Sequence, residues 1–287
     1  MMNGIVIVDK PQDWTSQDVT SRLRRVFHTR RIGHGGTLDP MATGVLPVFV
    51  GRATRGVEFF EHAEKTYETV LKPGLTTDTE DITGTVLTQQ PVSLTEDDVL
   101  RVLPQFRGEI LQVPPMYSAL KVNGQKLYDL ARKGKEVARQ PRPITIHELT
   151  FLGFCEDGIC LRVKCSKGTY IRTLCKDIGE ALGCGGCMAQ LRRISAGEYT
   201  SQEAVPLQEL LETEHPEKYL RGVDTMFREQ PAVTLTEKQE LRCRNGNSFS
   251  INLPDGTYRA YGQSGEFLML ATADNGVMST IKSFWEV

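Results

Sequence analysis

The sequence predicts an α+β protein that ends in a small β-barrel. Along the first 230 residues, short apolar runs typical of strands alternate with the i, i+3, i+4 spacing typical of amphipathic helices. After Pro231 the chain becomes rich in turns, such as Asn245-Gly246-Asn247 and Pro254-Asp255-Gly256, with short apolar stretches between them. A turn-rich β segment of this length favours a small barrel. We therefore expect two domains, residues 1–230 and 231–287.

The first elements are a strand and a helix. Ile5-Val6-Ile7-Val8 predicts a buried strand. Thr15-Ser16-Gln17-Asp18 has the spacing of a capping box, in which the Thr and Asp side chains bond free N–H groups at a helix start. The apolar residues that then fall on one helical face are Val19, Leu23, Val26 and Phe27.

Later elements follow the same patterns. Thr95-Glu96-Asp97-Asp98 opens another helix with a capping box. Apolar residues alternate with charged ones from Ile159 to Cys165, which predicts a half-buried strand, and a helical apolar stripe runs from Ile171 to Leu182 and ends at Gly183. Residues 107–142 have no clean period, and a basic insertion of this kind is typical of a mobile element or linker. In the tail we expect a short helix from Thr236 and strands at Thr257–Gly262, Phe267–Ala271 and Ile281–Val287.

The loop from Gly33 to Gly44 is the strongest candidate for a functional site. It contains four glycines, the single carboxylate Asp39 and Pro40, and it leads directly into the apolar strand Val45–Val50. Glycine permits unusual backbone angles and proline fixes the direction of the chain, so the loop presents Asp39 in one orientation. A tight Asp-Pro turn without function is the simpler interpretation of these two residues alone.

Common nucleotide and metal motifs are missing. No Gly-Lys-Ser/Thr follows a glycine loop, and Leu38 stands where a dinucleotide fingerprint needs its third glycine. His147-Glu148 lacks the second histidine of a zinc hydrolase. Cys184-Gly185-Gly186-Cys187 has no second cysteine pair at zinc spacing. We therefore expect no metal and no cofactor.

Composition limits the cellular setting. The chain has no run of about 18 apolar residues, which a membrane-spanning helix needs. Met1-Met2-Asn3-Gly4 carries no basic signal-peptide region, and seven cysteines is an odd number for a disulfide framework. The sequence therefore predicts a cytoplasmic protein with reduced cysteines and no membrane contact.

Charge is distributed unevenly, although the net charge is only −2. Positive clusters indicate an RNA-facing surface better than the sum of charges does, although any one cluster is commonly a solvated helix face. The three basic clusters are Arg22, Arg24, Arg25, Arg30 and Arg31; Lys121, Lys126, Arg132, Lys133, Lys135, Arg139 and Arg142; and Arg192 with Arg193. Such contacts would position a phosphate backbone without reading its sequence.

The glycine-rich loop resembles the signature of the TruB family of tRNA pseudouridine-55 synthases. The pattern Gly-His-x-Gly-x-Leu-Asp-Pro-x-Ala-x-Gly-Val-Leu is complete over residues 33–46. Six further blocks resemble the family in the same order along the chain: Lys10-Pro11 with Thr15-Ser16, Lys65-Thr66-Tyr67, Thr77–Asp81, Val113–Lys121, Gly168–Arg172 and Leu191-Arg192-Arg193. Together the blocks span about two thirds of the chain.

The resemblance implies a fold and an activity. Residues 1–230 would form the pseudouridine synthase catalytic fold, a mixed and mainly antiparallel sheet flanked by helices, with residues 107–142 folding over the RNA. Residues 231–287 would form a PUA-like domain. The protein would be an isomerase that converts uridine 55 in the T-loop of tRNA to pseudouridine. It would bind the T-arm stem-loop as a monomer without an obligate protein partner.

The resemblance also assigns roles to single residues. Asp39 would be the essential carboxylate, and it could attack C1′, attack C6 or remove a sugar proton. Arg172 would pair with Asp39, with Asp81 behind it, although an exposed arginine with a surface partner is the simpler interpretation of Arg172 alone. The remaining expected site residues are Tyr67, which would stack on the flipped base, Tyr170 and Leu191 in the base pocket, His34 in the loop, and Lys10.

Two other functions are compatible with this motif set. One is an RNA-binding and tRNA-folding protein in which catalysis is secondary. The other is a pseudouridine synthase directed by a guide RNA within a multi-protein particle. The intact motif residues favour the enzyme, and the 107–142 insertion favours the stand-alone type.

Overall fold

The computed structural model describes residues 2–122 and 124–285. Contacts between residues divide the chain into two compact units. Unit 1 consists of Met1–Pro40, Val45–Glu61 and Glu198–Val287, and unit 2 of Met41–Gly44 and His62–Gly197. Within the described ranges, no helix is long and apolar enough to cross a membrane.

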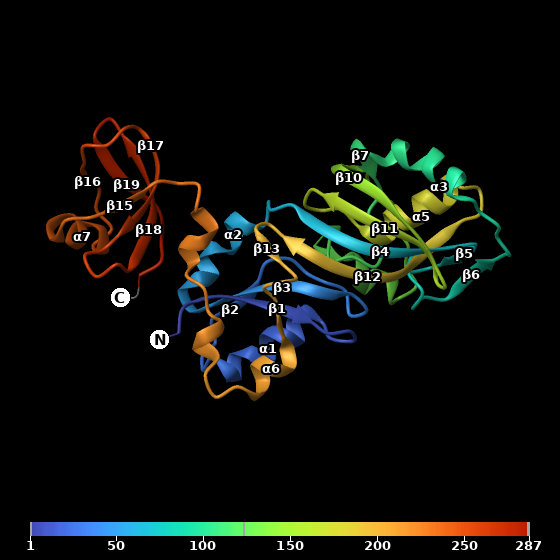
Figure 1. Ribbon diagram of the computed structural model, residues 1–287, viewed down its shortest axis with the longest axis horizontal. Coiled ribbons are helices and arrows are strands. Elements are labelled where there is room, and N and C mark those ends of the chain that lie inside the picture. The colour runs from blue at the N-terminus through green and yellow to red at the C-terminus, as the bar shows by residue number, and fades with distance from the viewer. Residues whose placement is uncertain (1, 123, 286–287) are drawn as a thin grey trace. The chain divides into compact units, whose positions relative to one another are not determined.

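The first part of unit 1 contains four paired strands, β14, β1, β3 and β2, with helices packed beside them. Strand β1 lies between β14 and β3, is parallel to β14, and is almost completely buried, which confirms the strand expected at residues 5–8. Helix α1 begins with the expected capping box of Thr15 and Asp18, and it packs against α6 (Figure 1). The elements are β1 (Gly4–Lys10), α1 (Ser16–Val26), β2 (Ile32–His34), β3 (Thr43–Val50), η1 (Gly51–Gly56), α2 (Val57–Phe60), β13 (Tyr199–Thr200), β14 (Val205–Pro206), α6 (Leu207–Glu212), η3 (Pro216–Tyr219) and η4 (Val223–Phe227).

The tail of unit 1 is a five-stranded, curled sheet in the order β15-β17-β18-β19-β16, with helix α7 beside it (Figure 1). Its elements are β15 (Ala232–Thr234), α7 (Glu237–Arg244), β16 (Phe249–Ser250), β17 (Gly256–Tyr261), β18 (Phe267–Asp274) and β19 (Val277–Ser283). The predicted strand Ile281–Val287 is displaced, because β19 already begins at Val277 after a turn at Asn275 and Gly276. Residues 286 and 287 of that prediction lie outside the described residues.

Aromatic side chains of the tail sheet pack against aromatic side chains in the rest of unit 1. Phe227 lies 5.3 Å from Phe59 and 6.2 Å from Phe267, measured between ring centroids. Phe284 stacks on Phe267 at 5.3 Å. We call Phe59, Phe227, Phe267 and Phe284 the aromatic cluster. Tyr261 Oη of the tail sheet also donates a hydrogen bond of 2.8 Å to Asp224 Oδ2 of η4, in the first part of unit 1.

Unit 2 contains an antiparallel sheet in the order β12-β4-β11-β10-β7. At one side, Thr43 and Gly44 pair in parallel with Arg192 and Arg193 of β12. Gly44 has a φ of +100°, and a Cβ atom there would lie 2.2 Å from the carbonyl oxygen of Arg193, so only glycine fits. Helix α5 packs on β12 and β4. This mixed, mainly antiparallel sheet with flanking helices confirms the predicted fold class.

The other elements of unit 2 follow the predicted helix and strand signals. The capping box at Thr95 and Asp98 is present, and α5 ends before Gly183, which has a φ of +76°. The elements are β4 (Lys65–Pro73), β5 (Leu75–Thr77), β6 (Val86–Gln89), α3 (Glu96–Val102), η2 (Leu103–Phe106), β7 (Gly108–Gln112), β8 (Lys121–Val122), β9 (Gln125–Lys126), α4 (Leu127–Ala131), β10 (Arg142–Cys155), β11 (Gly158–Cys165), α5 (Ile171–Ala181) and β12 (Gly186–Ala196).

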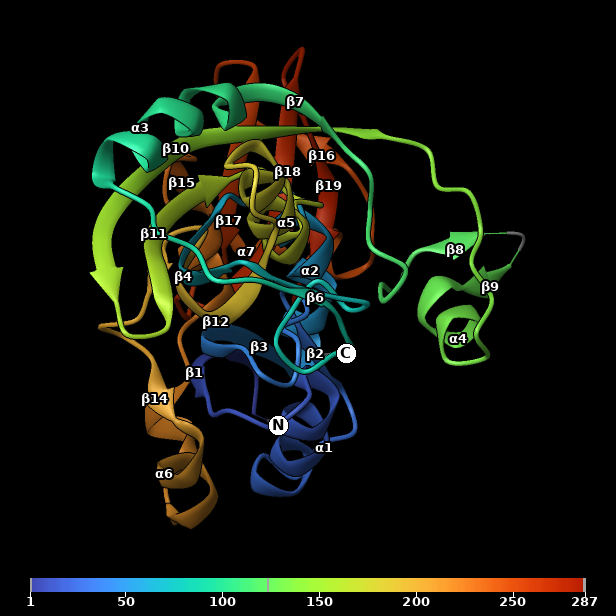
Figure 2. The same ribbon diagram turned by 90° about the vertical axis from the view of Figure 1, so that its right-hand side faces the viewer.

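The segment between β7 and β10 forms a small substructure of its own. Figure 2 shows β8, β9 and α4 together, apart from the sheet of the same unit. Met116, Leu127 and Leu130 form its core. Residues 108–112 of the expected 107–142 insertion are instead the edge strand β7, so the separate part begins after Gln112. We call residues 113–141 the basic segment; its residue 123 lies outside the described residues.

Candidate active site

The expected site residues fall in both units. Lys10, His34 and Asp39 belong to unit 1, whereas Tyr67, Asp81, Tyr170, Arg172 and Leu191 belong to unit 2.

Asp39 lies in a loop that is held on both sides of the carboxylate. The backbone N–H of Leu38 donates to Ser16 Oγ at 2.9 Å, and Ser16 Oγ is 3.2 Å from the carbonyl oxygen of Leu38. On the other side, the N–H of Asp13 donates to the carbonyl oxygen of Pro40 at 2.8 Å. Because Leu38 is buried and Asp39 is only half-buried, the loop turns one side chain inward and leaves the carboxylate partly accessible.

Lys10 supports the same loop. Its side chain is completely buried, and Nζ donates to the carbonyl oxygens of Trp14 at 2.6 Å, Pro11 at 2.9 Å and Pro40 at 3.2 Å. A buried ammonium needs such acceptors, because desolvation otherwise disfavours its charge. These contacts give Lys10 a role in shaping the loop around Asp39.

His34 is fixed by strand pairing. It is the last residue of β2 and lies opposite Val48 of β3. The next residue, Gly35, donates its N–H to Pro47 at 2.8 Å, and a Cβ atom at Gly35 would lie 2.4 Å from a ring carbon of Phe60. The glycine therefore lets the loop leave β2 close against an aromatic ring.

Tyr67 and Leu191 share one face of the sheet of unit 2. Tyr67 on β4 lies opposite Arg193 of β12, and Thr69 lies opposite Leu191. Residues two apart on a strand point to the same face, so all four side chains share it. Thr69 Oγ1 lies 3.7 Å from Cys175 Sγ of α5, which places this face beneath the helix that also carries Arg172.

The start of α5 is held by a glutamine from β7. Tyr170 is the residue before the helix, and its N–H donates to Gln112 Oε1 at 2.9 Å. Gln112 Nε2 in turn donates to the carbonyl oxygen of Tyr170 at 3.1 Å. Gln112 is 2% exposed, so this pair of bonds is shielded from water and fixes the backbone at Tyr170.

Arg172 is buried, which contradicts the interpretation of an ordinary exposed arginine. Only 6% of the residue is exposed. Its Nη1 donates to the carbonyl oxygen of Thr79 at 3.0 Å, and Nη2 donates to that of Tyr117 at 2.8 Å. Nη1 also lies 3.6 Å from Asp81 Oδ2. The guanidinium therefore ties the 78–81 loop to the start of the basic segment.

Asp81 is oriented by its own loop. Its Oδ1 accepts the N–H of Thr83 at 2.9 Å, the hydroxyl of Thr83 at 2.5 Å and the hydroxyl of Thr79 at 2.9 Å. The other oxygen, Oδ2, is the one that faces Arg172. A carboxylate with this many donors stays in one orientation.

The cysteines of the Cys184-Gly185-Gly186-Cys187 motif lie around the start of β12. Within the described part of the chain, no three or more His, Cys, Asp or Glu side chains are grouped as metal ligands. Cys187 is completely buried, and this burial raises the pKa of its thiol to about 11, so it stays protonated at neutral pH. Cys184, by contrast, is half-buried.

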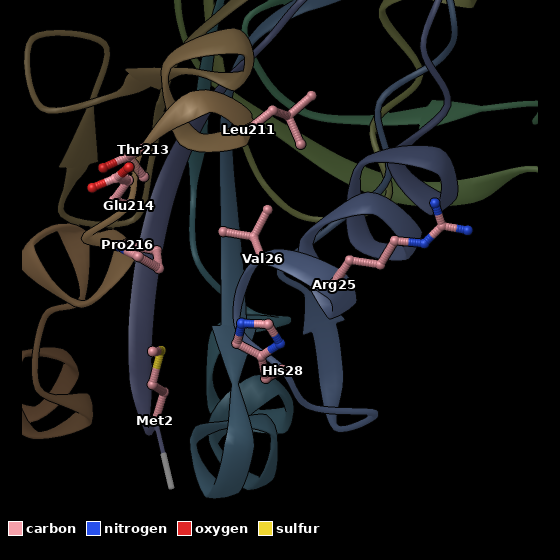
Figure 3. A pocket seen from close by; sticks show the side chains of 8 residues that line it. All are labelled: Met2, Arg25, Val26, His28, Leu211, Thr213, Glu214 and Pro216. Atoms are coloured by element: carbon pink, nitrogen blue, oxygen red, sulfur yellow. The ribbon is translucent and has the colours of Figure 1, made fainter.

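A surface hollow of about 400 Å³ lies elsewhere in unit 1 (Figure 3). It contains none of the expected site residues, but Arg25 of the first basic cluster reaches it. The lining residues are Met2, Arg25, Val26, His28, Leu211, Thr213, Glu214 and Pro216.

Two family models match the chain in succession. The model described as the N-terminal domain of the TruB family of pseudouridylate synthases matches residues 24–171. The model described as the C-terminal domain of tRNA pseudouridylate synthase B matches residues 172–225.

Similar proteins and structures agree with these models. The tRNA pseudouridine synthase B of Clostridium kluyveri is 39% identical over 99% of this chain and 100% of its own length. That of Dechloromonas aromatica is 46% identical over 89% of this chain and 85% of its own length. Among solved structures, an H/ACA RNP bound to a substrate RNA and a Cbf5-Nop10-Gar1 complex each contain a chain that aligns with TM-scores of 0.73 and 0.74, at 22% and 24% identity. Both alignments cover 99% of this chain and 85% of the other.

Proposed function

The chain belongs to the TruB family of pseudouridylate synthases, and we infer from this membership that it is a tRNA pseudouridine synthase, an isomerase. The observation that carries the inference is the near full-length similarity to tRNA pseudouridine synthases B together with the complete loop around Asp39. We further propose that the target is uridine 55 in the T-loop and that Asp39 is the essential group.

The reaction rearranges one nucleotide without adding or removing atoms overall. The N1–C1′ bond breaks, the uracil turns, and C5 bonds to C1′, while the proton on C5 leaves and N1 gains one. The target base must first leave its stack, which costs a few kcal/mol that contacts in the protein must offset. A carboxylate can serve as the nucleophile at C1′ or C6, or as the base that removes a sugar proton.

The position of Asp39 in the chain supports this role. Thr43, which follows it after a short stretch of loop, pairs with Arg192 next to Leu191. The carboxylate is thus joined by a short piece of backbone to the strand that carries Leu191 and Arg193.

The residues of unit 2 supply the proposed base pocket. Tyr67 and Leu191 share the sheet face beneath α5, and an aromatic ring on such a face can stack on an extruded base. Tyr170 precedes α5 and would line the same pocket. Arg172, already held by two carbonyl oxygens and Asp81, would pair with Asp39.

The basic segment is our proposed clamp for the T-arm stem-loop. It has its own apolar core and carries exposed cations, among them Lys121, Lys133 and Lys135. Such cations attract a phosphate backbone and make binding sensitive to salt. We propose that the protein acts as a monomer on bare tRNA in the cytoplasm, without an obligate protein partner.

The RNA-folding and guide-directed alternatives are less well supported. The similarity to Cbf5-type structures concerns the fold, whereas the relatives at about 40% identity are named for tRNA alone. Turnover on bare tRNA by the purified chain would separate the stand-alone enzyme from the guide-directed type.

Tritium release from tRNA labelled at uridine C5 tests the function. We expect release by the wild type without added metal or nucleotide, and none by Asp39→Asn, which keeps the fold and tRNA binding. Release by the variant would contradict the role of Asp39. Tight tRNA binding without release by the wild type would favour the RNA-folding alternative.

A further inference from the structure

Glu80 has a backbone conformation that is unusual for its residue type. Its φ is +63°, in the left-handed region that long side chains rarely adopt. The carbonyl oxygen of Glu80 accepts the N–H of Met188 at 3.0 Å, and its N–H lies 3.3 Å from the carbonyl oxygen of Thr77. Strain of this kind persists only where surrounding contacts enforce it, and it is common next to functional sites.

The side chain of Glu80 bonds the first turn of α5. Thr173 Oγ1 donates to Glu80 Oε2 at 2.5 Å, and Lys176 Nζ lies 3.5 Å from Glu80 Oε1. Only 12% of the Glu80 side chain is exposed, and Thr173 is 1% exposed, so the hydroxyl–carboxylate bond is shielded from water. Hydrogen bonds to a charged group are among the stronger ones.

Helix α5 has no acidic residue in its first turn and no side-chain cap at Tyr170. A negative charge near the positive end of a helix is stabilising. Glu80 supplies that charge from a different element, while its neighbours Thr79 and Asp81 hold Arg172. The loop of residues 79–81 therefore contacts two successive residues of α5, Arg172 and Thr173.

We propose that Glu80 and Thr173 are positioning residues that fix the first turn of α5, so that the guanidinium of Arg172 meets the substrate site in one orientation. This inference rests on the role of Arg172 in the proposed function. The strained conformation of Glu80 places three consecutive residues, Thr79, Glu80 and Asp81, in contact with the same helical turn.

Thr173 offers a matched pair of variants. Thr173→Val keeps the shape of the side chain and removes the hydroxyl that Glu80 accepts, whereas Thr173→Ser keeps the hydroxyl. A misplacement of about 1 Å at a reacting group can cost about 100-fold in rate. We therefore expect Thr173→Val to lower kcat by about 10- to 100-fold with KM within about threefold, and Thr173→Ser to retain kcat near the wild-type value.

A double-mutant cycle tests whether the effect passes through Arg172. In an Arg172→Lys background, Thr173→Val should cause little further loss, because the orientation it protects is already lost. The proposal would be overturned if the kcat losses of the two single variants multiplied in the double variant. An unchanged kcat in Thr173→Val would also overturn it. Should Thr173→Val fail to fold, Glu80→Gln, which removes the charge and keeps an acceptor, takes its place in the same cycle.

Hydrogen exchange gives a readout that does not depend on turnover. The amides of residues 171–175 should exchange faster in Thr173→Val than in Thr173→Ser, since the first turn of α5 is less firmly held. Equal exchange in the two variants would overturn the proposal. Failure of the wild type to release tritium would instead reject the proposed function, and the exchange comparison would still decide whether Glu80 and Thr173 hold this turn.

Discussion

The guanidinium of Arg172 is bound by two carbonyl oxygens and one carboxylate, all within unit 2. Removing one partner from a buried ion pair costs about 3–5 kcal/mol, since the remaining charge stays buried. Arg172→Ala would leave the carboxylate of Asp81, which is 5% exposed, buried without its cationic partner. The informative substitution at this position is therefore one that keeps the charge.

Arg172→Lys keeps the positive charge but removes the planar guanidinium, whose two Nη atoms bond two separate carbonyl oxygens. We expect kcat for tRNA to fall by about 100-fold, with KM within about threefold. Single-turnover and steady-state tritium release measure both constants. A loss confined to tRNA affinity would instead make Arg172 a phosphate contact.

Asp177 of α5 is half-buried, which is unfavourable for its carboxylate at neutral pH. Burial raises the pKa of its carboxyl from 3.8 to about 6, with Lys176 opposing the shift and Glu180 and Glu80 adding to it. The folded protein therefore binds the proton more tightly than the unfolded chain, and stability falls as the pH rises through this range.

Asp177→Asn should remove this penalty. We expect the variant to have a higher Tm than the wild type at about pH 8, and the difference to be much smaller at about pH 4, where the wild-type carboxyl is protonated in the folded state and about half protonated in the unfolded chain. Thermal unfolding at the two pH values measures it. A Tm difference that does not depend on pH would show that the substitution acts through packing.

Single residues of the site differ in how well the sequence predicts their surroundings. Gly44 was foreseeable as a special backbone position, because glycine in a constrained loop indicates one. The bonds of Arg172 to Thr79 and Tyr117 were not, since main-chain acceptors leave no signal in residue type. The same holds for Gln112, whose buried amide holds Tyr170 from a strand far away in the sequence.

At the scale of elements, the basic segment combines a small core with a charged exterior. Met116, Leu127 and Leu130 are buried, while Lys133 and Lys135 are exposed. Two cations lie near the ring of Tyr128, with Lys126 Nζ 5.2 Å and the Arg132 guanidinium 5.4 Å from its centroid. The exposed lysines can therefore be changed without disturbing the packing.

Lys133→Gln with Lys135→Gln should weaken tRNA binding and reduce the slope of log K against log salt by up to about two, because each lysine would neutralise one phosphate. Titrations at several salt concentrations measure both quantities. The control is Lys218→Gln, an exposed lysine in η3 among acidic residues. Unchanged affinity and slope in the double variant would argue against a clamp; a deletion of residues 124–138 should then bind normally as well.

Elements with local signals were predicted best. Helices α1, α3 and α7 each begin with a capping box, in which the bonded residues lie three positions apart in the sequence. Strand β7 was missed because it is an edge strand with little burial, and Leu111 on it is 70% exposed, so the alternation typical of strands is absent. Its pairing with β10 is a long-range contact that no local pattern encodes.

For the whole molecule, the net charge of −2 is a poor guide to its partner. The acidic residues include those of α7 and α3, and several form ion pairs within the protein, such as Glu240 with Arg244. The exposed cations of the basic segment have few acidic neighbours in sequence, so the local field there is set by them. Charge distribution therefore predicted the RNA partner better than composition did.

Phe227→Ala tests how much the aromatic cluster contributes to stability. Phe227 is 6% exposed and contacts rings on both sides, so truncation should cost about 3–5 kcal/mol and lower Tm by about 10 °C. The matched control is Phe154→Ala, since Phe154 is 49% exposed. Equal Tm changes in the two variants would show that the cluster contributes no more than a surface ring.

The aromatic cluster also governs how the tail can be studied. Truncating the chain near residue 230 would remove Phe267 and Phe284. The rings of Phe59 and Phe227 would then be exposed on the remaining fragment. Exposed apolar patches of this kind promote aggregation and recruit chaperones or proteases. If a truncated gene fails to complement in cells, the cause would therefore be poor solubility of the fragment before any loss of RNA binding. Point substitutions on the outer surface of the tail test its role without this problem.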